Sequence, residues 1–160
     1  MINKLLNIVY FILKKKEIKK ARIRIKKIPI DDILKLIIKN CEDRSVRYKI
    51  LEKNHDTICI DLFGKKEKVL LKYHKSDMVF REDYNEFINK LKREHVDKGI
   101  YITTGLFEAE IHKNENKLLY LKKIVLDDYY CFFKKQIRLF GKADTVFDKK
   151  QLNFYRYLPK

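Results

Sequence analysis

Two short strand-like runs joined by a tight turn constrain the fold of this chain more than any other feature. Residues 57–63 and 68–74 are rich in β-branched and aromatic side chains, which favour strands. A turn at residues 64–66, Gly-Lys-Lys, separates the two runs. The pattern therefore predicts a β-hairpin.

The segments that flank the hairpin alternate between helical and strand-like patterns. After Pro29, two acids and then apolar residues at helical spacing predict a helix with one buried face. A helix that connects strands of one sheet implies parallel pairing at its centre, so we expect an α/β fold with helices on both faces. Beside the hairpin, the expected elements are helices at 31–41, 83–94 and 129–139, strands at 46–52, 100–104 and 123–126, and a helical turn at 106–111.

Residues 1–28 have a different character from the rest of the chain. Residues 5–13 are almost wholly apolar, and a lysine triplet follows at 14–16. The run is too short to span a bilayer, which takes about 20 apolar residues, and it lacks the pattern of a signal peptide. We expect a helix that packs on the domain or on a partner chain, such as a second copy, in preference to one on an anionic membrane surface. Residues 21–28 fit either an edge strand or a continuation of this helix.

The chain is strongly basic. Its 38 Lys and Arg residues outnumber 22 Asp and Glu residues, which gives a formal net charge of +16 and a pI near 9.7. Such a charge favours a polyanionic partner, either nucleic acid or an anionic membrane surface. The length of 160 residues suits one compact domain. We expect an N-terminal extension at 1–28, the domain at 29–142 and a tail at 143–160.

The cysteines give no sign of a disulfide or a zinc site. Cys41, Cys59 and Cys131 are odd in number and widely spaced, without a CxxC motif or a histidine at zinc-ligand spacing. We therefore expect buried thiols in a reducing cytoplasm. The sequence also lacks P-loop, nucleophile-elbow, HExxH and dinucleotide-glycine motifs, which argues against the enzymes that use them.

Two stretches after the second helix carry a resemblance to a known family. In residues 96–107, a Lys-Gly pair leads into a hydrophobic strand that ends in Thr-Thr, and a Phe follows shortly after. Residues 124–128 form another strand with an acidic end. Over about residues 29–140 the chain resembles the Mrr-like branch of the restriction-endonuclease-like, or PD-(D/E)XK, nuclease superfamily. The resemblance implies a central mixed β-sheet flanked by helices, to which the N-terminal amphipathic helix is an extra element.

The resemblance also implies an active site on the hairpin. Family members place an Asp before the first strand and the pattern Glu or Gln, any residue, Lys on the second. Asp56 then matches the metal-binding Asp and Lys72 the catalytic Lys. Asp61 is the rival for the metal-binding Asp, because the sequence does not settle the hairpin register. The implied cofactor is Mg²⁺, if the protein is active.

Leu70 is the point at which the chain departs from the family pattern, since Glu or Gln is expected there. A Leu offers no oxygen to a hard cation, and metal-assisted phosphodiester hydrolysis needs carboxylates that hold the cation. One alternative is that another acid has taken over as ligand; the other is that Asp56 caps a turn and Lys72 is a solvated or phosphate-contacting residue. The acids considered as migrated ligands are Asp31, Asp32, Glu67 and Glu86.

The leading hypothesis is a DNA-binding protein of the cytoplasm, with duplex DNA as partner and with weak or lost nuclease activity. An active Mg²⁺-dependent endonuclease with a migrated ligand is the first alternative. A basic structural or interaction protein that docks on a membrane or a nucleoprotein assembly is the second. The residues expected to contact nucleic acid are Lys65, Lys66, Lys75, Thr103 and Thr104.

Overall fold

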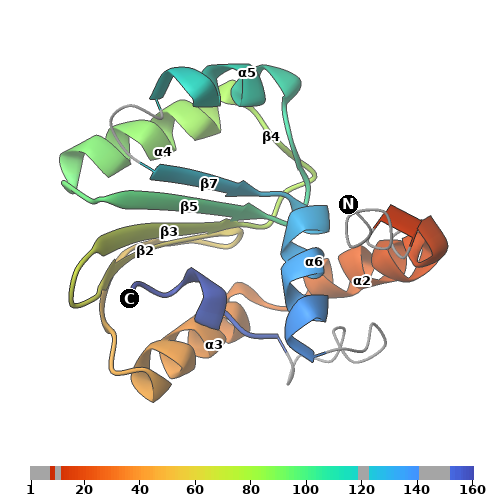
Figure 1. The fold of residues 1–160 in the computed structure, drawn as a ribbon, viewed down its shortest axis with the longest axis horizontal. Helices are drawn as coiled ribbons and strands as arrows, with labels where there is room; N and C mark the ends of the chain where they lie inside the picture. The colour runs from red at the N-terminus through yellow and green to blue at the C-terminus, as the bar shows by residue number, and fades with distance from the viewer. Residues whose placement is uncertain (1–7, 10–11, 119–122, 141–151) are drawn as a thin grey trace.

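A five-stranded mixed sheet forms the centre of the molecule in the computed structural model, which describes residues 8–9, 12–118, 123–140 and 152–160 (Figure 1). The first three strands in the order β1-β2-β3-β5-β7 pair antiparallel, and the last three pair parallel. The predicted central mixed sheet is therefore confirmed. Its strands are β1 (Arg47–Lys53), β2 (Thr57–Phe63), β3 (Lys68–His74), β5 (Lys98–Thr103) and β7 (Lys123–Asp127).

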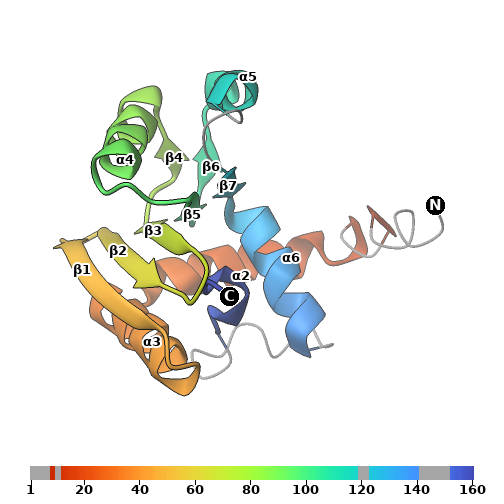
Figure 2. The ribbon, with the colours of Figure 1, turned by 60° about the vertical axis from the view of Figure 1, so that its left-hand side comes forward.

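Helices cover both faces of this sheet, as predicted (Figures 1 and 2). Helices α4 and α5 lie on one side, whereas α3 and the C-terminal segment lie on the other. A separate two-stranded parallel ladder, β4 (Met78–Val79) with β6 (Leu106–Phe107), lies beside the main sheet. The helices are α2 (Lys15–Lys27), α3 (Ile30–Asp43), α4 (Arg81–Arg93), α5 (Ala109–Leu118) and α6 (Tyr129–Phe140), with a 3₁₀ turn η3 (Tyr155–Tyr157).

Alternate residues of the hairpin strands face different helices. Ile58 and Ile60 belong to the core that β2 shares with α2, α3 and α6, whereas Cys59 and Leu70 pack in the second core under α4. Both faces of β2 and β3 are therefore covered, which is why each strand is apolar along most of its length. The hairpin strands begin and end at the predicted residues.

Residues 21–27 continue the N-terminal helix and do not form an edge strand, the other alternative that the sequence left open. Residues 15–27 form α2, and Ile18, Ala21 and Ile25 are buried in the first core. This part of the helix packs on the domain, whereas the contact expected for the apolar run at 5–13 stays a prediction. Of the preceding apolar run, Ile8, Val9, Ile12 and Leu13 are described and exposed, and the remainder lies outside the described residues. Within the described residues, no helix is both long and apolar enough to cross a membrane.

One predicted element differs from the observed one. Residues 106–111 were expected to form a helical turn, but Leu106 and Phe107 pair with β4 as a strand, and the helix α5 begins at Ala109. The pairing depends on a segment almost thirty residues away, so local periodicity does not indicate it. The boundaries after residues 28 and 142 stay predictions. Side chains from both flanking segments, Ile25 and Phe154 among them, lie in the same core.

Two glycines allow the elements around β5 to approach one another closely. A Cβ at Gly99 would lie 2.1 Å from Leu91 Cδ1 and 3.0 Å from Phe87 Cζ, so a larger residue there would require these side chains of α4 to shift. A Cβ at Gly105 would lie 2.2 Å from the carbonyl oxygen of Asp77, where the chain passes the segment before β4. These two contacts explain the Lys-Gly and Thr-Thr-Gly features of residues 98–105 by packing.

Candidate functional site

The parallel strands give the sheet a C-terminal end and an N-terminal end, here called rims. The candidate residues are divided between these two rims. The C-terminal rim comprises the ends of β3 and β5, His74 and Thr103, and the start of the antiparallel β2, Thr57. The N-terminal rim comprises the starts of β3, β5 and β7 and the turn between β2 and β3. A seven-residue strand such as β3 puts the two rims about 20 Å apart.

Asp56 lies at the C-terminal rim, directly before β2. Its carbonyl oxygen accepts a hydrogen bond from the backbone N–H of Lys75 at 2.7 Å, which ties it to the end of β3. Its carboxylate accepts a hydrogen bond from the Thr57 hydroxyl at 2.9 Å and lies 3.4 Å from the His55 ring. Asn54 closes the turn before β2, because its side-chain Oδ1 accepts the backbone N–H groups of Asp56 and Thr57; the Asp56 carboxylate itself does not cap this turn.

Lys72 belongs to a buried polar cluster near the same rim. It is 4% exposed and lies opposite Cys59 on β2 and Tyr101 on β5, with Nζ 5.0 Å from the centre of the Tyr101 ring. The Tyr101 hydroxyl and His74 Nδ1 are 2.9 Å apart. Burial lowers the pKa of His74, and the neighbouring Lys72 charge lowers it further. Lys72, His74 and Tyr101, here called the Lys72 cluster, are therefore packed into the molecule rather than solvated.

Glu52 is the acid beside this cluster that sequence reasoning missed. It lies on β1 opposite Cys59, at a register shift in the ladder between β1 and β2. Its carboxylate forms an ion pair with Lys90 of α4, whose hydrogen bond is the main reason that the pKa of Glu52 is lowered. The charges of Lys72 and Asp56 also act on Glu52. No local signal reveals the position of Glu52, because it depends on a bulge and on a helix 38 residues away.

Asp61 lies away from Asp56, toward the N-terminal rim. It is fully buried opposite Leu70, and its carboxylate is 2.8 Å from Lys68 Nζ. Burial raises the pKa of Asp61, whereas the Lys68 ammonium opposes that rise. Asp61 lies five positions after Asp56 along β2, a distance of about 16 Å. The structure therefore does not bring Asp56 and Asp61 to one site.

The arrangement does not fit a hard divalent cation. Leu70 is fully buried in the core under α4, and the carboxylates of Asp61 and Glu52 are taken by lysines. Among the residues that the structure describes, no three His, Cys, Asp or Glu side chains converge to hold a metal ion. The acids considered as migrated ligands have other partners: Asp31 pairs with Lys53, Asp32 with Lys35, Glu86 with Lys90, and Glu67 accepts from the backbone N–H of Lys160.

The lysines predicted to contact nucleic acid lie at different rims. Lys65 and Lys66 are exposed at the turn between β2 and β3, which belongs to the N-terminal rim. Lys75 lies at the C-terminal rim, where Nζ donates a hydrogen bond to the carbonyl oxygen of Ile28 at 3.0 Å. A single DNA-binding surface around Asp56 would therefore include Lys75 but not Lys65 or Lys66.

The two threonines in the same prediction are buried, which corrects the expectation that they contact phosphate. Thr103 and Thr104 are 1% and 2% exposed. The Thr103 hydroxyl accepts a hydrogen bond from the backbone N–H of Gly105, and the Thr104 hydroxyl donates to and accepts from the backbone of Ser76. Both hydroxyls hold the turn that follows β5, so they are not presented to solvent.

Helix α2 brings positive charge to the C-terminal rim. Arg22 Nε donates a hydrogen bond to the Thr104 carbonyl at 3.1 Å, and both Arg22 and Lys26 form ion pairs with Asp77. In Figure 1 the arrows of β5 and β7 point toward α6 and α2. Helix α2 carries six exposed basic residues, for which the described part of the chain shows no ion-pair partner: Lys15, Lys16, Lys19, Lys20, Arg24 and Lys27.

A hollow of about 260 Å³ lies between α2 and α6. Basic and apolar side chains of α2 line it together with two tyrosines of α6, Tyr129 and Tyr130. The Arg22 guanidinium stacks over the Tyr129 ring, 4.5 Å from its centre. The hollow thus combines positive charge with aromatic rings beside the C-terminal rim.

No protein family matches the chain, and no curated protein sequence matches it. Solved structures that match include the DNA modification-dependent restriction endonuclease AspBHI, at 12% identity and a TM-score of 0.47 over 86% of this chain and 38% of that one. Another is the MspJI restriction endonuclease in complex with a 27-mer oligonucleotide, at 12% identity and a TM-score of 0.33 over 92% of this chain and 34% of that one. The chain thus spans about a third of the length of each. Because both TM-scores are below 0.5, neither similarity supports an assignment of function, which therefore depends on the residues of this chain.

Proposed function

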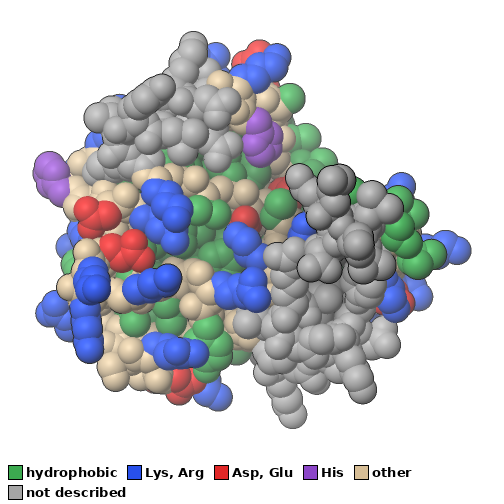
Figure 3. All heavy atoms as spheres, in the orientation of Figure 1, with side chains coloured by type: hydrophobic (Ala, Val, Ile, Leu, Met, Phe, Trp, Pro, Cys, Tyr) green, Lys and Arg blue, Asp and Glu red, His purple; other side chains and the backbone are tan. Residues whose placement is uncertain are grey.

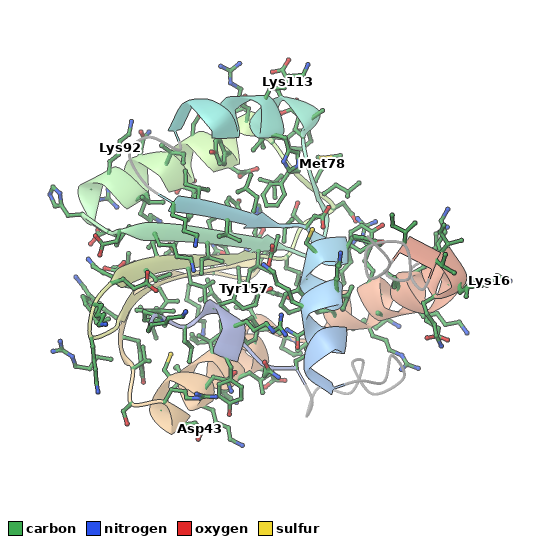
Figure 4. The ribbon with its side chains drawn as sticks, viewed as in Figure 1. Lys16, Asp43, Met78, Lys92, Lys113 and Tyr157 are labelled. Carbon is green, nitrogen blue, oxygen red and sulfur yellow. The ribbon has the colours of Figure 1, made fainter. Side chains whose placement is uncertain are left out.

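We propose that the protein binds duplex DNA through α2 and the adjoining C-terminal rim, and that metal-dependent cleavage is weak or lost. The observation that carries this proposal is the row of six exposed basic residues on α2. Figure 4 labels Lys16 at the outer end of this helix, away from the sheet. The resemblance of the sequence to restriction-endonuclease-like nucleases also favours duplex DNA as the partner.

The packing of α2 supports this role because it fixes the helix backbone from which the charged side chains extend. Ile18, Ala21 and Ile25 anchor the inner side in the core, so the outer side is displayed on a rigid rod. The 13 residues of α2 span about 20 Å. A row of cations of that length lies alongside many backbone phosphates, since duplex DNA carries one charge per about 1.7 Å of its axis.

The hollow between α2 and α6 adds a second kind of contact. Tyr129 and Tyr130 line it beside Lys15 and Lys19. Aromatic rings next to basic side chains suit sugar and base contacts that accompany phosphate contacts. Binding dominated by phosphates is expected to have little sequence preference.

The chemistry of the Lys72 cluster supports loss of cleavage. Lys72 is buried against Tyr101, and the nearby acid Glu52 is paired with Lys90. With Leu70 in place of a ligand, the described residues leave no set of carboxylates for Mg²⁺. We therefore assign Asp56 and Lys72 structural roles rather than catalytic ones.

Titration of a fluorescent 20-base-pair duplex at 50 and 200 mM salt tests both parts of the proposal. If α2 engages about six phosphates, affinity is expected to fall about 1,000-fold between these salt concentrations. The same samples, incubated with Mg²⁺ or Mn²⁺, are expected to keep the duplex intact. Absence of binding at 50 mM salt, or binding indifferent to salt, would refute the DNA-binding role. Cleavage that is abolished by Asp56→Ala or Lys72→Ala would refute the loss of activity.

A further inference from the structure

A second concentration of positive charge lies at the N-terminal rim, remote from α2. Lys98 of β5 and Lys123 of β7 are direct partners across the parallel ladder. Directly opposite residues of neighbouring strands place their side chains on the same face, about 5 Å apart at Cβ. The two lysine side chains therefore leave the sheet side by side on one face.

Two further lysines, Lys135 and Lys160, lie close enough for their charges to influence Lys98. Burial is the largest cause of the lowered pKa of Lys98; the Glu67 charge, next in size, raises this pKa, and the charges of Lys123, Lys135 and Lys160 lower it. Glu67 is the acid that opposes them, and it also accepts the backbone N–H of Lys160. In Figure 3, Lys and Arg side chains gather over the strands and around the C-terminal end of the chain.

Not every lysine of this area is available to a ligand. Lys135 Nζ donates to the Asp127 carboxylate at 2.6 Å, and that carboxylate also accepts the Tyr157 hydroxyl at 2.8 Å. Lys98 and Lys123, in contrast, have no ion-pair partner among the residues that the structure describes. Like charges directly opposite in a ladder destabilise a sheet, so this pair is maintained at a cost to folding.

We propose that Lys98, Lys123 and Lys160 form an anion site that binds a phosphate group. A bound phosphate would offset the repulsion between the two strand lysines and supply the acceptors that their ammonium groups lack. This site is distinct from the DNA-binding surface proposed on α2, because the two lie at opposite ends of the strands. Free phosphate and the phosphates of a nucleic-acid backbone share the required chemistry.

Thermal unfolding at pH 7 tests the site, with sodium phosphate compared with sodium chloride at equal ionic strength. If phosphate is present at about ten times its Kd, the Tm of the wild-type protein is expected to rise by about 3 °C. Lys98→Gln/Lys123→Gln is expected to lose this rise, while its Tm in chloride equals or exceeds that of the wild type. The matched control is Lys16→Gln/Lys20→Gln, which removes the same charge from α2 and is expected to keep the rise. Lys123→Gln alone, at an exposed position, serves as a milder second variant.

A rise that survives in both rim variants, or that chloride produces equally, would overturn the anion site. Duplex titration of the rim double variant then identifies the source of the phosphate. A loss of more than threefold in duplex affinity would assign the site to nucleic-acid backbone, whereas unchanged affinity together with a lost phosphate response would assign it to a free phosphate group. Failure of the wild type to bind duplex would refute the function proposed for α2 but leave the phosphate response intact.

Discussion

The two rims of the sheet carry positive charge in different ways. At the C-terminal rim, the exposed charges lie on α2, where lysines such as Lys16 and Lys20 extend into solvent and the buried side of the helix is apolar. At the N-terminal rim, Lys98 and Lys123 come directly from neighbouring strands and face each other. Exposed charges on a helix surface repel one another weakly because water and salt screen them. On paired strands, by contrast, the backbone ladder fixes two like charges side by side, so their repulsion is larger.

This difference teaches that net charge alone does not locate a binding surface. The chain carries a net charge of +16, and exposed basic residues lie at both rims; among the described residues, α2 displays six of them along one helix. The N-terminal rim offers a compact group suited to one anion. We therefore expect an extended polyanion at the first surface and a single phosphate group at the second.

The largest expected effect concerns duplex affinity. Replacement of Lys15, Lys16, Lys19 and Lys20 by Gln is expected to weaken duplex binding about 100-fold at 100 mM salt and to reduce the salt slope by about 3.6, since about four phosphate contacts are lost. The matched control makes the same charge change at exposed lysines outside both proposed surfaces: Lys39, Lys49, Lys92 and Lys113 replaced by Gln. Fluorescence anisotropy over a salt series measures both. Equal losses in the two variants would mean that net charge, not the α2 surface, governs binding.

The second prediction concerns the space between the rims, where the family pattern expects a metal ligand. Leu70 is fully buried beside the core residues under α4, so Leu70→Glu would bury a carboxylate without a partner. The free energy of unfolding is expected to fall by about 4 kcal/mol. Leu70→Met, which conserves volume, is expected to cost less than about 1.5 kcal/mol.

Urea unfolding of the two Leu70 variants, with and without Mn²⁺, measures this effect. No rescue by Mn²⁺ is expected for the Glu variant, because the neighbouring Asp61 is paired with Lys68. Restoration of stability by Mn²⁺ would show that the hairpin retains a latent metal site.

The third prediction concerns the ion pair near the N-terminal rim. Lys68→Met leaves the Asp61 carboxylate buried without its partner and is expected to cost about 3 kcal/mol. The double variant Lys68→Met/Asp61→Leu removes both charges and is expected to recover most of that loss. Chemical unfolding of the two variants at pH 7 provides the measurement. A double variant less stable than Lys68→Met would contradict the interpretation that the unpaired charge causes the loss.

The smallest effect concerns pH and the C-terminal rim. Burial and the Lys72 charge lower the pKa of His74 in the folded state, so the unfolded chain binds a proton more readily. Stability is therefore fully present above the ordinary histidine pKa of about 6.5 and is lost as pH falls toward the folded-state pKa, by at most about 1.4 kcal/mol per pH unit. The charges of Asp56, Asp83 and Glu86 oppose this shift.

Unfolding measured from pH 7.5 to 5.0 checks the effect against His74→Gln, which is expected to flatten this part of the profile. His55 is exposed and serves as the control position. A profile unchanged by His74→Gln but flattened by His55→Gln would reverse the assignment.

Much of the fold could be predicted from local patterns, but the site could not. The bounds of β2 and β3, the mixed sheet and the helix after Pro29 follow from periodicity and turn chemistry. The burial of Thr103 and Thr104 was not foreseen, because two threonines in a strand look the same whether their hydroxyls face solvent or a turn. Glu52 was missed because a bulge in β1 sets its register.

The sequence by itself determined most of the strands and helices, since hydrophobic alternation, helix periodicity and turn residues act between near neighbours, but not the short strand at residues 106–107. It also determined the excess of positive charge. Only the tertiary structure decided where that charge lies. The contact of Arg22 with Thr104 and the pairing of Lys98 with Lys123 join distant segments, and which segments meet depends on how two cores close around one sheet.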